Sequence, residues 1–192
     1  LSEFDGDVVP INPNRETILG TDCYADVTTA PDPTTFDLAI VIVPARIVGD
    51  VVRQAGAVGI PNVIVITAGF SERGADGERR ERELTAVAER YDLNLIGPNC
   101  VGVINTSNRL NATFLRGTPR TGAISLISQS GGFISAVLDW ATAHDVGFNR
   151  VVSLGNEAVL DEVDLIAELG TDPETEVILV YLEDVDDGRA FI

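Results

Sequence analysis

Many apolar positions of the first hundred residues fall into three short segments that are separated by longer amphipathic stretches. The run at 38–43 is typical of a strand that is buried on both faces, and further strands are expected at 63–66 and 93–96. Between them, apolar residues recur at helical spacing over 47–55 and, among many Glu and Arg residues, over 77–91. Strands that alternate with helices through short links predict right-handed crossovers and a parallel sheet.

The alternation lapses between residues 101 and 122, where polar residues, Gly and Pro predominate, and this stretch is the best candidate for a domain boundary. A second alternation follows, with strands expected at 123–127, 150–153 and 177–182 and helices at about 132–144 and 161–169. We therefore expect an α/β fold with two parallel-sheet domains, residues 1–119 and 120–192.

The chain has an unusually large negative net charge. Thirty acidic residues against 13 basic ones give a formal net charge of -17, and every basic residue is Arg. An acidic surface without Lys predicts adaptation to molar salt, where the Debye length falls to roughly 3 Å and self-repulsion is screened. The alternative is an ordinary acidic protein with few Lys residues by chance. On either interpretation nucleic acid is not an expected partner, because phosphate binding needs a basic face.

Other features bear on the compartment and on the ends of the chain. The sequence has no apolar run of membrane-spanning length and no signal peptide, so we expect no membrane association and a cytoplasmic protein. Cys23 and Cys100 give no disulfide framework, which fits a reducing compartment. The chain contains no Met, opens on what resembles a strand end at 8–11, and closes on the first turn of a helix at 188–192. We therefore expect a fragment of a longer protein.

The loop at 128–132 joins a predicted strand to a predicted helix and contains Ser128, Ser130, Gly131 and Gly132. Backbone N–H groups and the helix dipole would converge there, which favours an anion, and the two glycines would let a phosphate approach the backbone. A plain turn with a Ser N-cap is an equally good interpretation. No Lys is present for a Walker-type nucleotide site, and the glycines follow the serines, unlike in a nucleophile elbow.

Other reactive side chains have structural interpretations. His144, the single histidine, falls near a helix end, where it would interact with terminal carbonyls. One His and two distant Cys residues predict no metal site. Cys100 is better explained as a small buried thiol beside a ligand loop than as a nucleophile. Asp161 and Asp164 are expected to cap a helix start.

Seven short segments occur in the order and spacing of the nucleoside-diphosphate-forming acyl-CoA synthetases. They are Asn12-Pro13, Val43-Pro44-Ala45, the run from Ile66 to Glu72, the run from Ile96 to Gly102, the run from Leu110 to Phe114, Ser128-Gln129-Ser130-Gly131, and Ser153-Leu154-Gly155-Asn156. The chain resembles the ADP-forming acetyl-CoA synthetases and, more distantly, the α subunit of succinyl-CoA synthetase. Each motif alone is weak, but seven in sequence are specific, and the similarity covers the whole chain.

The resemblance implies a partial Rossmann-like CoA-binding domain, lacking its first strand and Gly-rich loop, followed by a partial flavodoxin-like ligase domain. By motif matching, the implied CoA-site residues are Val43, Pro44, Ala45, Ile66, Thr67 and Ala68, with Asn99 and Cys100 near the thiol end and Arg15, by a loose alignment, near a CoA phosphate. The implied phosphate loop is Ser128, Gln129, Ser130, Gly131 and Gly132. Glu183 matches the carboxylate that receives the phosphohistidine.

The family reaction implied is the interconversion of acyl-CoA, ADP and phosphate with acid, CoA and ATP through acyl phosphate and phosphohistidine. His144 does not match the phosphorylated histidine, which the family pattern places downstream of Ile192, so the chain alone is expected to be inactive. The implied ligands are CoA and a small carboxylic acid. The implied partner is an ATP-grasp domain or subunit that binds ATP or ADP with Mg, in a homo-oligomer or an α/β complex. The alternatives are the regulatory half of a protein acetyltransferase and a stand-alone CoA-binding module.

Overall fold

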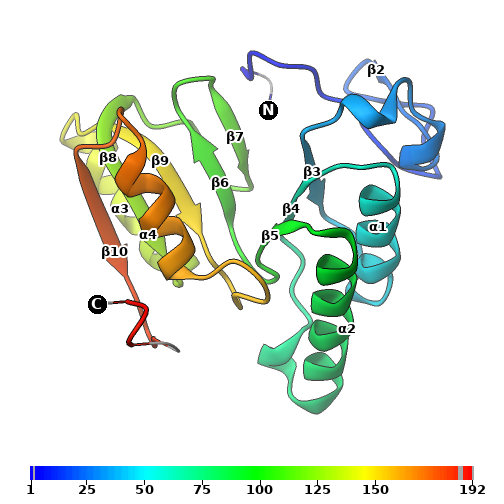
Figure 1. The fold of residues 1–192 in the computed structure, drawn as a ribbon. Coiled ribbons are helices and arrows are strands. Elements are labelled where there is room, and N and C mark those ends of the chain that lie inside the picture. The colour runs from blue at the N-terminus through cyan, green and yellow to red at the C-terminus, as the bar shows by residue number, and fades with distance from the viewer. Residues whose placement is uncertain (2, 186–187, 192) are drawn as a thin grey trace.

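A computed structural model describes residues 1, 3–185 and 188–191. The chain forms two α/β lobes, each with its own sheet (Figure 1). The first lobe has a parallel sheet of order β3-β4-β5 whose strands are connected by two helices. Its elements are β3 (Leu38–Val41), α1 (Ala45–Ala57), β4 (Asn62–Val65), α2 (Ala75–Tyr91) and β5 (Asn94–Ile96). The alternation expected from the apolar runs is confirmed, with bounds shifted by up to two residues.

Both helices of the first lobe cover the same face of its sheet, because the strands follow one another in spatial order. Val63, Val65 and Leu95 point into this core, where they meet apolar side chains of α1 and α2 such as Val52 and Leu84. All five are almost completely buried. Their burial supplies hydrophobic free energy that stabilises the sheet. The candidate site is formed by the loops that follow the carboxyl ends of its strands.

The stretch expected to be an irregular boundary instead contains a β-hairpin, β6 (Gly102–Asn105) and β7 (Leu110–Thr113). Successive side chains of a strand point to opposite faces, so β6 contributes to two cores at once. Val103 packs on the second face of the first sheet, in the same cluster as Ile64 of β4. Ile104, by contrast, is buried in the core of the second lobe. The hairpin thereby fastens the lobes together, and the boundary placed between residues 119 and 120 stays a prediction.

The second lobe has a five-stranded sheet of order β10-β8-β9-β6-β7. Its remaining elements are β8 (Thr121–Ser128), α3 (Gly131–Ala143), β9 (Phe148–Ser153), α4 (Glu162–Thr171) and β10 (Val177–Tyr181). Strands β10, β8 and β9 are parallel, as expected, while β6 runs antiparallel to both β9 and β7. The antiparallel hairpin at the edge was not anticipated from the sequence, because its four-residue strands lie in a polar stretch.

The strand order of the second sheet reverses direction at β8. From β8 the chain moves through α3 to β9 on one side, then returns through α4 to β10 on the other. The two helices consequently cover opposite faces: α3 packs on Leu126, and α4 on the neighbouring Ile127. In open α/β sheets ligands bind outside the carboxyl ends of strands at such a switch point. Here the switch point lies between β8 and β10.

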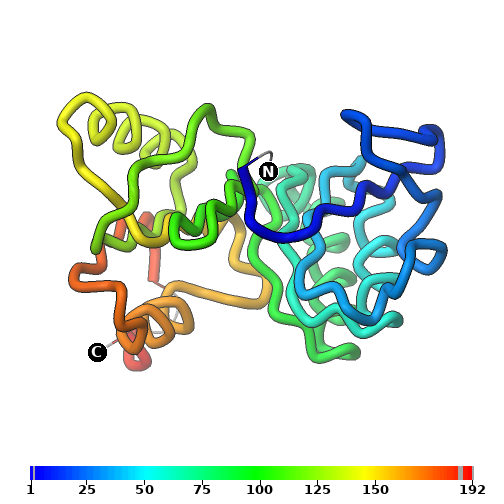
Figure 2. Tube along the Cα trace, turned by 90° about the horizontal axis from the view of Figure 1, so that it is seen from above, coloured from blue at the N-terminus to red at the C-terminus, as the bar shows by residue number. Residues whose placement is uncertain are grey.

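The ends of the chain follow less regular paths. The expected strand end at 8–11 is reduced to one isolated bridge between Ile11 and Tyr24, and the short strands β1 (Thr17–Ile18) and β2 (Thr21–Asp22) form a small hairpin. The first residues cross from the β6-β7 hairpin to the first lobe (Figure 2), and Asp5 pairs with Arg109 on the way. Residues 188–190 form a turn, and the last residue of the helix start expected at 188–192 lies outside the described residues.

Short 3-10 helices complete the described chain, at Val27–Thr29, Pro33–Thr35 and, after β4, Ser71–Arg73. Within the described residues, none of the helices combines the length and the apolar character that a membrane crossing requires.

Candidate functional site

The carboxyl ends of the three strands in the first sheet lead into three loops, 42–44, 66–69 and 97–100, and these loops contact one another. The Thr67 hydroxyl donates a 2.7 Å hydrogen bond to the carbonyl of Val43. The backbone N–H of Asn99 donates to the carbonyl of Thr67 at 3.0 Å. The structure therefore brings together the segments that the resemblance assigns to CoA, at the edge where such sheets bind ligands.

This edge, which we call the first-lobe edge (residues 42–45, 66–69 and 97–100), is lined mainly by small side chains, with Ile42 and Ile66 as larger apolar exceptions. Gly69 has φ of +113°, and a Cβ there would lie 2.9 Å from the Cβ of Ala45 at the start of α1. A larger residue would push the loop off the helix. Pro44, Ala68 and Asn99 are exposed, while Val43, Ala45, Ile66 and Thr67 are half-buried. The arrangement leaves backbone and small side chains open to a ligand.

Cys100 differs from the rest of the edge. Its side chain is 4% exposed, and its Sγ donates to the carbonyl of Val65 at 3.4 Å. Burial raises the pKa of the Cys100 thiol to about 12. Because the thiolate is the reactive form, a thiol with this pKa is inert at neutral pH. The interpretation of Cys100 as a small buried thiol is confirmed, and its assignment to the thiol end of CoA stays a prediction.

Arg15 lies in the turn before β1, exposed to solvent. Its backbone N–H donates to the carbonyl of Asn12, whose side chain accepts from the N–H of Asn14. Among the described residues, no hydrogen bond joins the Arg15 side chain to the first-lobe edge. Its assignment to a CoA phosphate stays a prediction.

The predicted phosphate loop lies at the start of α3, at the carboxyl end of β8. Ser130 is the N-cap of α3, and its hydroxyl accepts from the N–H of Phe133 at 3.3 Å. Ser128 is completely buried, and its hydroxyl is bonded at 3.0 Å to both the N–H and the carbonyl of Ser130. Ser128 therefore shapes the loop. The positive end of the dipole of the 13-residue helix α3, together with its first N–H groups, favours an anion there.

The two glycines of this loop have different surroundings. A Cβ on Gly131 would lie 2.5 Å from Cγ2 of Val101, so the missing side chain makes room for the chain that links the lobes. Gly132 is exposed, and a Cβ there would meet only the Ser130 hydroxyl, at 4.0 Å. Of the two, Gly132 fits the expectation that a ligand approaches the backbone closely, whereas Gly131 is needed for packing.

Gln129 connects the phosphate loop to the segment after β10. Its side-chain carbonyl accepts from the N–H groups of Glu183 and Asp184, and its amide donates to the carbonyl of Asp184 at 3.1 Å. The rings of Phe133 and Tyr181 stack beside it with centroids 4.4 Å apart. The structure thus brings exposed Glu183 to the phosphate loop at the switch point, as the resemblance implies.

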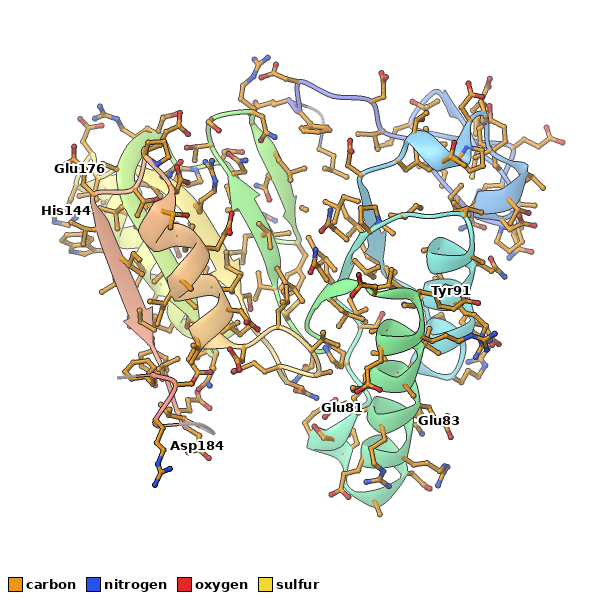
Figure 3. All side chains as sticks on the ribbon, viewed as in Figure 1. Glu81, Glu83, Tyr91, His144, Glu176 and Asp184 are labelled. Atoms are coloured by element: carbon orange, nitrogen blue, oxygen red, sulfur yellow. The ribbon has the colours of Figure 1, made fainter. Side chains whose placement is uncertain are left out.

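His144 lies at the other end of α3 from the phosphate loop. In Figure 3 His144 and Glu176, which precedes β10, are labelled at one end of the second lobe, and Asp184, which follows β10, is labelled at the opposite end. Nδ1 of His144 lies 2.8 Å from the carbonyl of Trp140, and its ring stacks on that of Trp140. The interpretation of His144 as a helix-end residue is confirmed.

Sequence reasoning missed the loop between β9 and α4, although it quoted Gly155 and Asn156 as a motif. Gly155 has φ of +69°, and a Cβ there would lie 2.2 Å from the carbonyl oxygen of Pro98. Asn156 then reaches into the first lobe, where its side chain contacts Glu72 and Asn99. The available signal was the glycine followed by a polar residue directly after a buried strand.

Glu157 and Glu162 in the same region also escaped notice. Glu162 is 2% exposed, and Glu157 faces it and Gln129. Burial, together with a hydrogen bond and charge repulsion from Glu162, raises the pKa of Glu157 to about 7. The pair therefore holds a proton near neutral pH beside the phosphate loop. Asp161 and Asp164 cap α4 as expected: the Asp161 side chain accepts from the N–H groups of Val163 and Asp164, and the Asp164 side chain accepts from the N–H of Asp161.

Metal ligands are not grouped within the described residues, where no three His, Cys, Asp or Glu side chains gather as a metal ion would need. The two edges instead present small residues, helix N-termini and backbone N–H groups, which suit an organic ligand and its phosphates. Fold and edges together define a two-lobed α/β protein with one candidate ligand edge in each lobe.

Residues 1–106 match the family described as CoA binding domain, and residues 121–192 match the family described as succinyl-CoA ligase like flavodoxin domain. The chain belongs to the CoA binding domain family, whose model matches more than half of it. Along its whole length it is similar to ADP-forming acetate–CoA ligases. The expected fold class, with a CoA-binding part followed by a flavodoxin-like ligase part, is confirmed.

Relatives support this assignment along the whole chain. Acetate–CoA ligase (ADP-forming) I of Archaeoglobus fulgidus is 49% identical over 192 residues, which are 100% of this chain and 28% of that protein. Acetate–CoA ligase (ADP-forming) II subunit alpha of Pyrococcus furiosus is 39% identical over 193 residues, 100% of this chain and 42% of that subunit.

The fold is shared with a solved structure, that of the dinucleotide forming acetyl-coenzyme A synthetase 1 of Ca. Korarchaeum cryptofilum in complex with phosphate and ADP. It has a TM-score of 0.92 at 38% identity, over 98% of this chain and 40% of that one. The chain therefore spans 28 to 42% of the length of these three proteins.

Proposed function

We propose that the protein carrying this chain is a cytoplasmic ADP-forming acyl-CoA synthetase and that the chain supplies its CoA site and its phosphate site. The observation that carries the proposal is the pairing of two ligand edges in one chain. The loops at 43–45 and 66–68 meet at the first, and the loop at 128–132 meets Glu183 at the second. The alternative function, a stand-alone CoA-binding module, does not explain the phosphate loop and the carboxylate at the second edge.

CoA would bind along the first-lobe edge. Val43, Pro44 and Ala45 with Ile66, Thr67 and Ala68 would line it, and Asn99 would lie toward the thiol end. The fit is supported by Gly69, whose lack of a side chain lets the loop lie on α1, and by the exposure of Pro44 and Ala68. A long, mostly extended ligand needs such an open edge rather than a closed cavity.

At the second edge the start of α3 would hold phosphate, with Gly132 and the loop N–H groups as donors. A phosphate oxygen attacks the acyl carbonyl and the CoA sulfur leaves as thiolate, which gives acyl phosphate and free CoA. The phosphoryl group then passes to a histidine nitrogen, and the acid leaves. Glu183 would accept a hydrogen bond from the other ring nitrogen of that histidine, which fixes the nitrogen that is phosphorylated.

ADP or ATP with Mg would bind in an ATP-grasp domain or partner subunit, and a small carboxylic acid would be the acyl substrate. The names of the relatives, which include acetate–CoA ligases and a separate alpha subunit, support this assignment of the nucleotide to another domain or subunit.

Calorimetric titration of the complete protein with CoA in molar KCl tests the proposal. Ala68→Trp should abolish CoA binding, because an indole at this exposed position would fill the first-lobe edge. Ala57→Trp is the matched control, since Ala57 is also exposed but ends α1 at the opposite side of the sheet. Absence of heat at millimolar CoA with the unaltered protein would contradict the CoA assignment.

A further inference from the structure

The side chain of Asn156 crosses from the second lobe into the first and makes four contacts there. Its Nδ2 lies 3.0 Å from the Ser71 hydroxyl, 2.8 Å from Oε2 of Glu72 and 2.7 Å from Oε2 of Glu81. Its Oδ1 accepts from Nδ2 of Asn99 at 3.1 Å. Two N–H groups are thus shared among three acceptors, two of which are carboxylates.

Glu72 connects Asn156 to the loop 66–69 of the first-lobe edge. Its carboxylate accepts from the N–H groups of Gly69 and Phe70, so the loop after β4 is folded around it. Burial would raise the pKa of Glu72, but hydrogen bonds from Asn156, Gly69 and Phe70 outweigh it and hold the pKa below its ordinary value. The carboxylate is therefore charged, and Asn156 is one of the donors that satisfy it.

Asn99 connects Asn156 to a second loop of the first-lobe edge, 97–100. While its side chain donates to Asn156, its backbone N–H donates to the carbonyl of Thr67 at 3.0 Å. The backbone of the β9-α4 loop reinforces this position, because the N–H of Asn156 donates to Pro98 at 2.9 Å and that of Ala158 donates to Gly97 at 3.1 Å. One carboxamide therefore contacts residues that fix both the loop after β4 and the loop after β5.

We propose that Asn156 is a positioning residue for CoA: from the ligase lobe it holds the loops 66–69 and 97–100 in the arrangement that binds CoA. The inference rests on the proposed CoA function and deepens it, because it assigns part of the CoA site to a residue outside the CoA binding domain match at 1–106. Asn156 does not itself touch the reacting atoms.

A neutral donor is what this position requires. Glu72 and Glu81 both lie within 2.8 Å of the same nitrogen, so their charges face each other across the amide. Asn156→Asp keeps the shape but places a third carboxylate between them, which removes donors and adds repulsion. Asn156→Ala only removes donors. The charged variant should therefore have the larger effect.

The test uses the complete protein, with CoA affinity measured by calorimetry and with KM values for CoA and for phosphate measured separately. Asn156→Asp should weaken CoA binding about tenfold or more and Asn156→Ala about threefold, with kcat at saturating CoA and KM for phosphate within about twofold. Asn156→Asp combined with Glu72→Gln should recover part of the affinity, since the new amide donates to the new carboxylate while Glu81 still faces it. Asn94→Asp, at the amino end of β5, is the matched control and should leave CoA affinity unchanged.

Each outcome decides the inference. It is overturned if Asn156→Asp binds CoA like Asn94→Asp, or if KM for CoA and KM for phosphate rise together with a fall in melting temperature, as a merely structural role predicts. It is also overturned if the double variant is no better than Asn156→Asp. Failure of the unaltered protein to bind CoA would overturn the proposed function, whereas equal binding by the unaltered protein and Asn156→Asp would overturn this inference alone.

Discussion

The carboxyl group of Glu157 hydrogen-bonds to that of Glu162, a residue only 2% exposed at the first turn of α4. Such a contact requires that one of the two groups keep its proton. The pKa of Glu157 is accordingly raised from 4.5 to about 7, first by burial and then by Glu162. Because Gln129 also faces Glu157, the proton lies beside the predicted phosphate loop.

We predict that Glu157→Gln makes the folded protein more stable above pH 7. The folded state holds this proton more tightly than the unfolded state, so the free energy of unfolding falls as the pH rises from 4.5 through about 7. The amide keeps a donor toward Glu162 and cannot ionise. After allowance for partial exposure, the gain above pH 7 should be about 1 to 2 kcal/mol.

Urea unfolding between pH 4 and pH 9 measures this difference, which should vanish below pH 4.5. Glu168→Gln, an exposed position on the same helix, is the matched control and should run parallel to the unaltered protein. Stability curves of Glu157→Gln and the unaltered protein that stay parallel across the whole range would contradict the assignment of the proton to this pair.

A second prediction concerns the contact of Gly155 with Pro98. Gly155→Ala combines a left-handed φ of +69° with a Cβ placed 2.2 Å from a backbone oxygen, so the loop must move away from β5. We expect a loss of about 2 to 4 kcal/mol in the free energy of unfolding. Gly49→Ala, inside α1 with open space around it, should instead add up to about 1 kcal/mol. Equal effects of the two substitutions in thermal unfolding would refute this account of the junction.

Part of the fold could be predicted from the sequence, and part of it depends on contacts between distant residues. Strands such as β3 and β4 were predictable because their apolar runs are continuous and local. The hairpin was not, because Val103 and Ile104 serve different cores and a four-residue alternation in a polar stretch gives little signal. The role of Asn156 was not predictable either, since its partners Asn99 and Glu72 are 57 and 84 positions away. Side-chain pairing over such separations depends on the finished fold.

A third prediction addresses phosphorylation. His144 ends α3 on the opposite side of the lobe from Glu183, and its ring is already stacked on Trp140. When the complete protein is incubated with radiolabelled ATP, acid-labile label should therefore map to a histidine other than His144. His144→Gln should be labelled as fully as the unaltered protein. Residues 1–192 alone should stay unlabelled with ATP or with acetyl-CoA and phosphate, and label on His144 would move the catalytic centre to α3.

The last prediction concerns salt. At a net charge of -17, repulsion among exposed carboxylates destabilises the folded protein in dilute buffer. Each pair contributes little, but the terms add, and a domain has only about 5–15 kcal/mol of stability to lose. Arg residues offset part of this repulsion through exposed pairs such as Arg79 with Asp76, which salt also weakens. Since acidic residues exceed Arg by more than two to one, the net effect of screening should be stabilising.

The melting temperature should rise by at least about 5 °C from 0.1 M to 2 M KCl, and by more than in sucrose of equal osmolality, which strengthens apolar burial without screening charge. A variant with four exposed acidic residues converted to amides, at Glu83, Asp139, Glu168 and Glu176, should be less salt-dependent, because fewer charges remain to be screened. A melting temperature that stays flat or falls in KCl would show that the acidic composition is incidental. The salt-adaptation hypothesis would then be dropped, while the CoA assignment, which rests on the two edges, would stand.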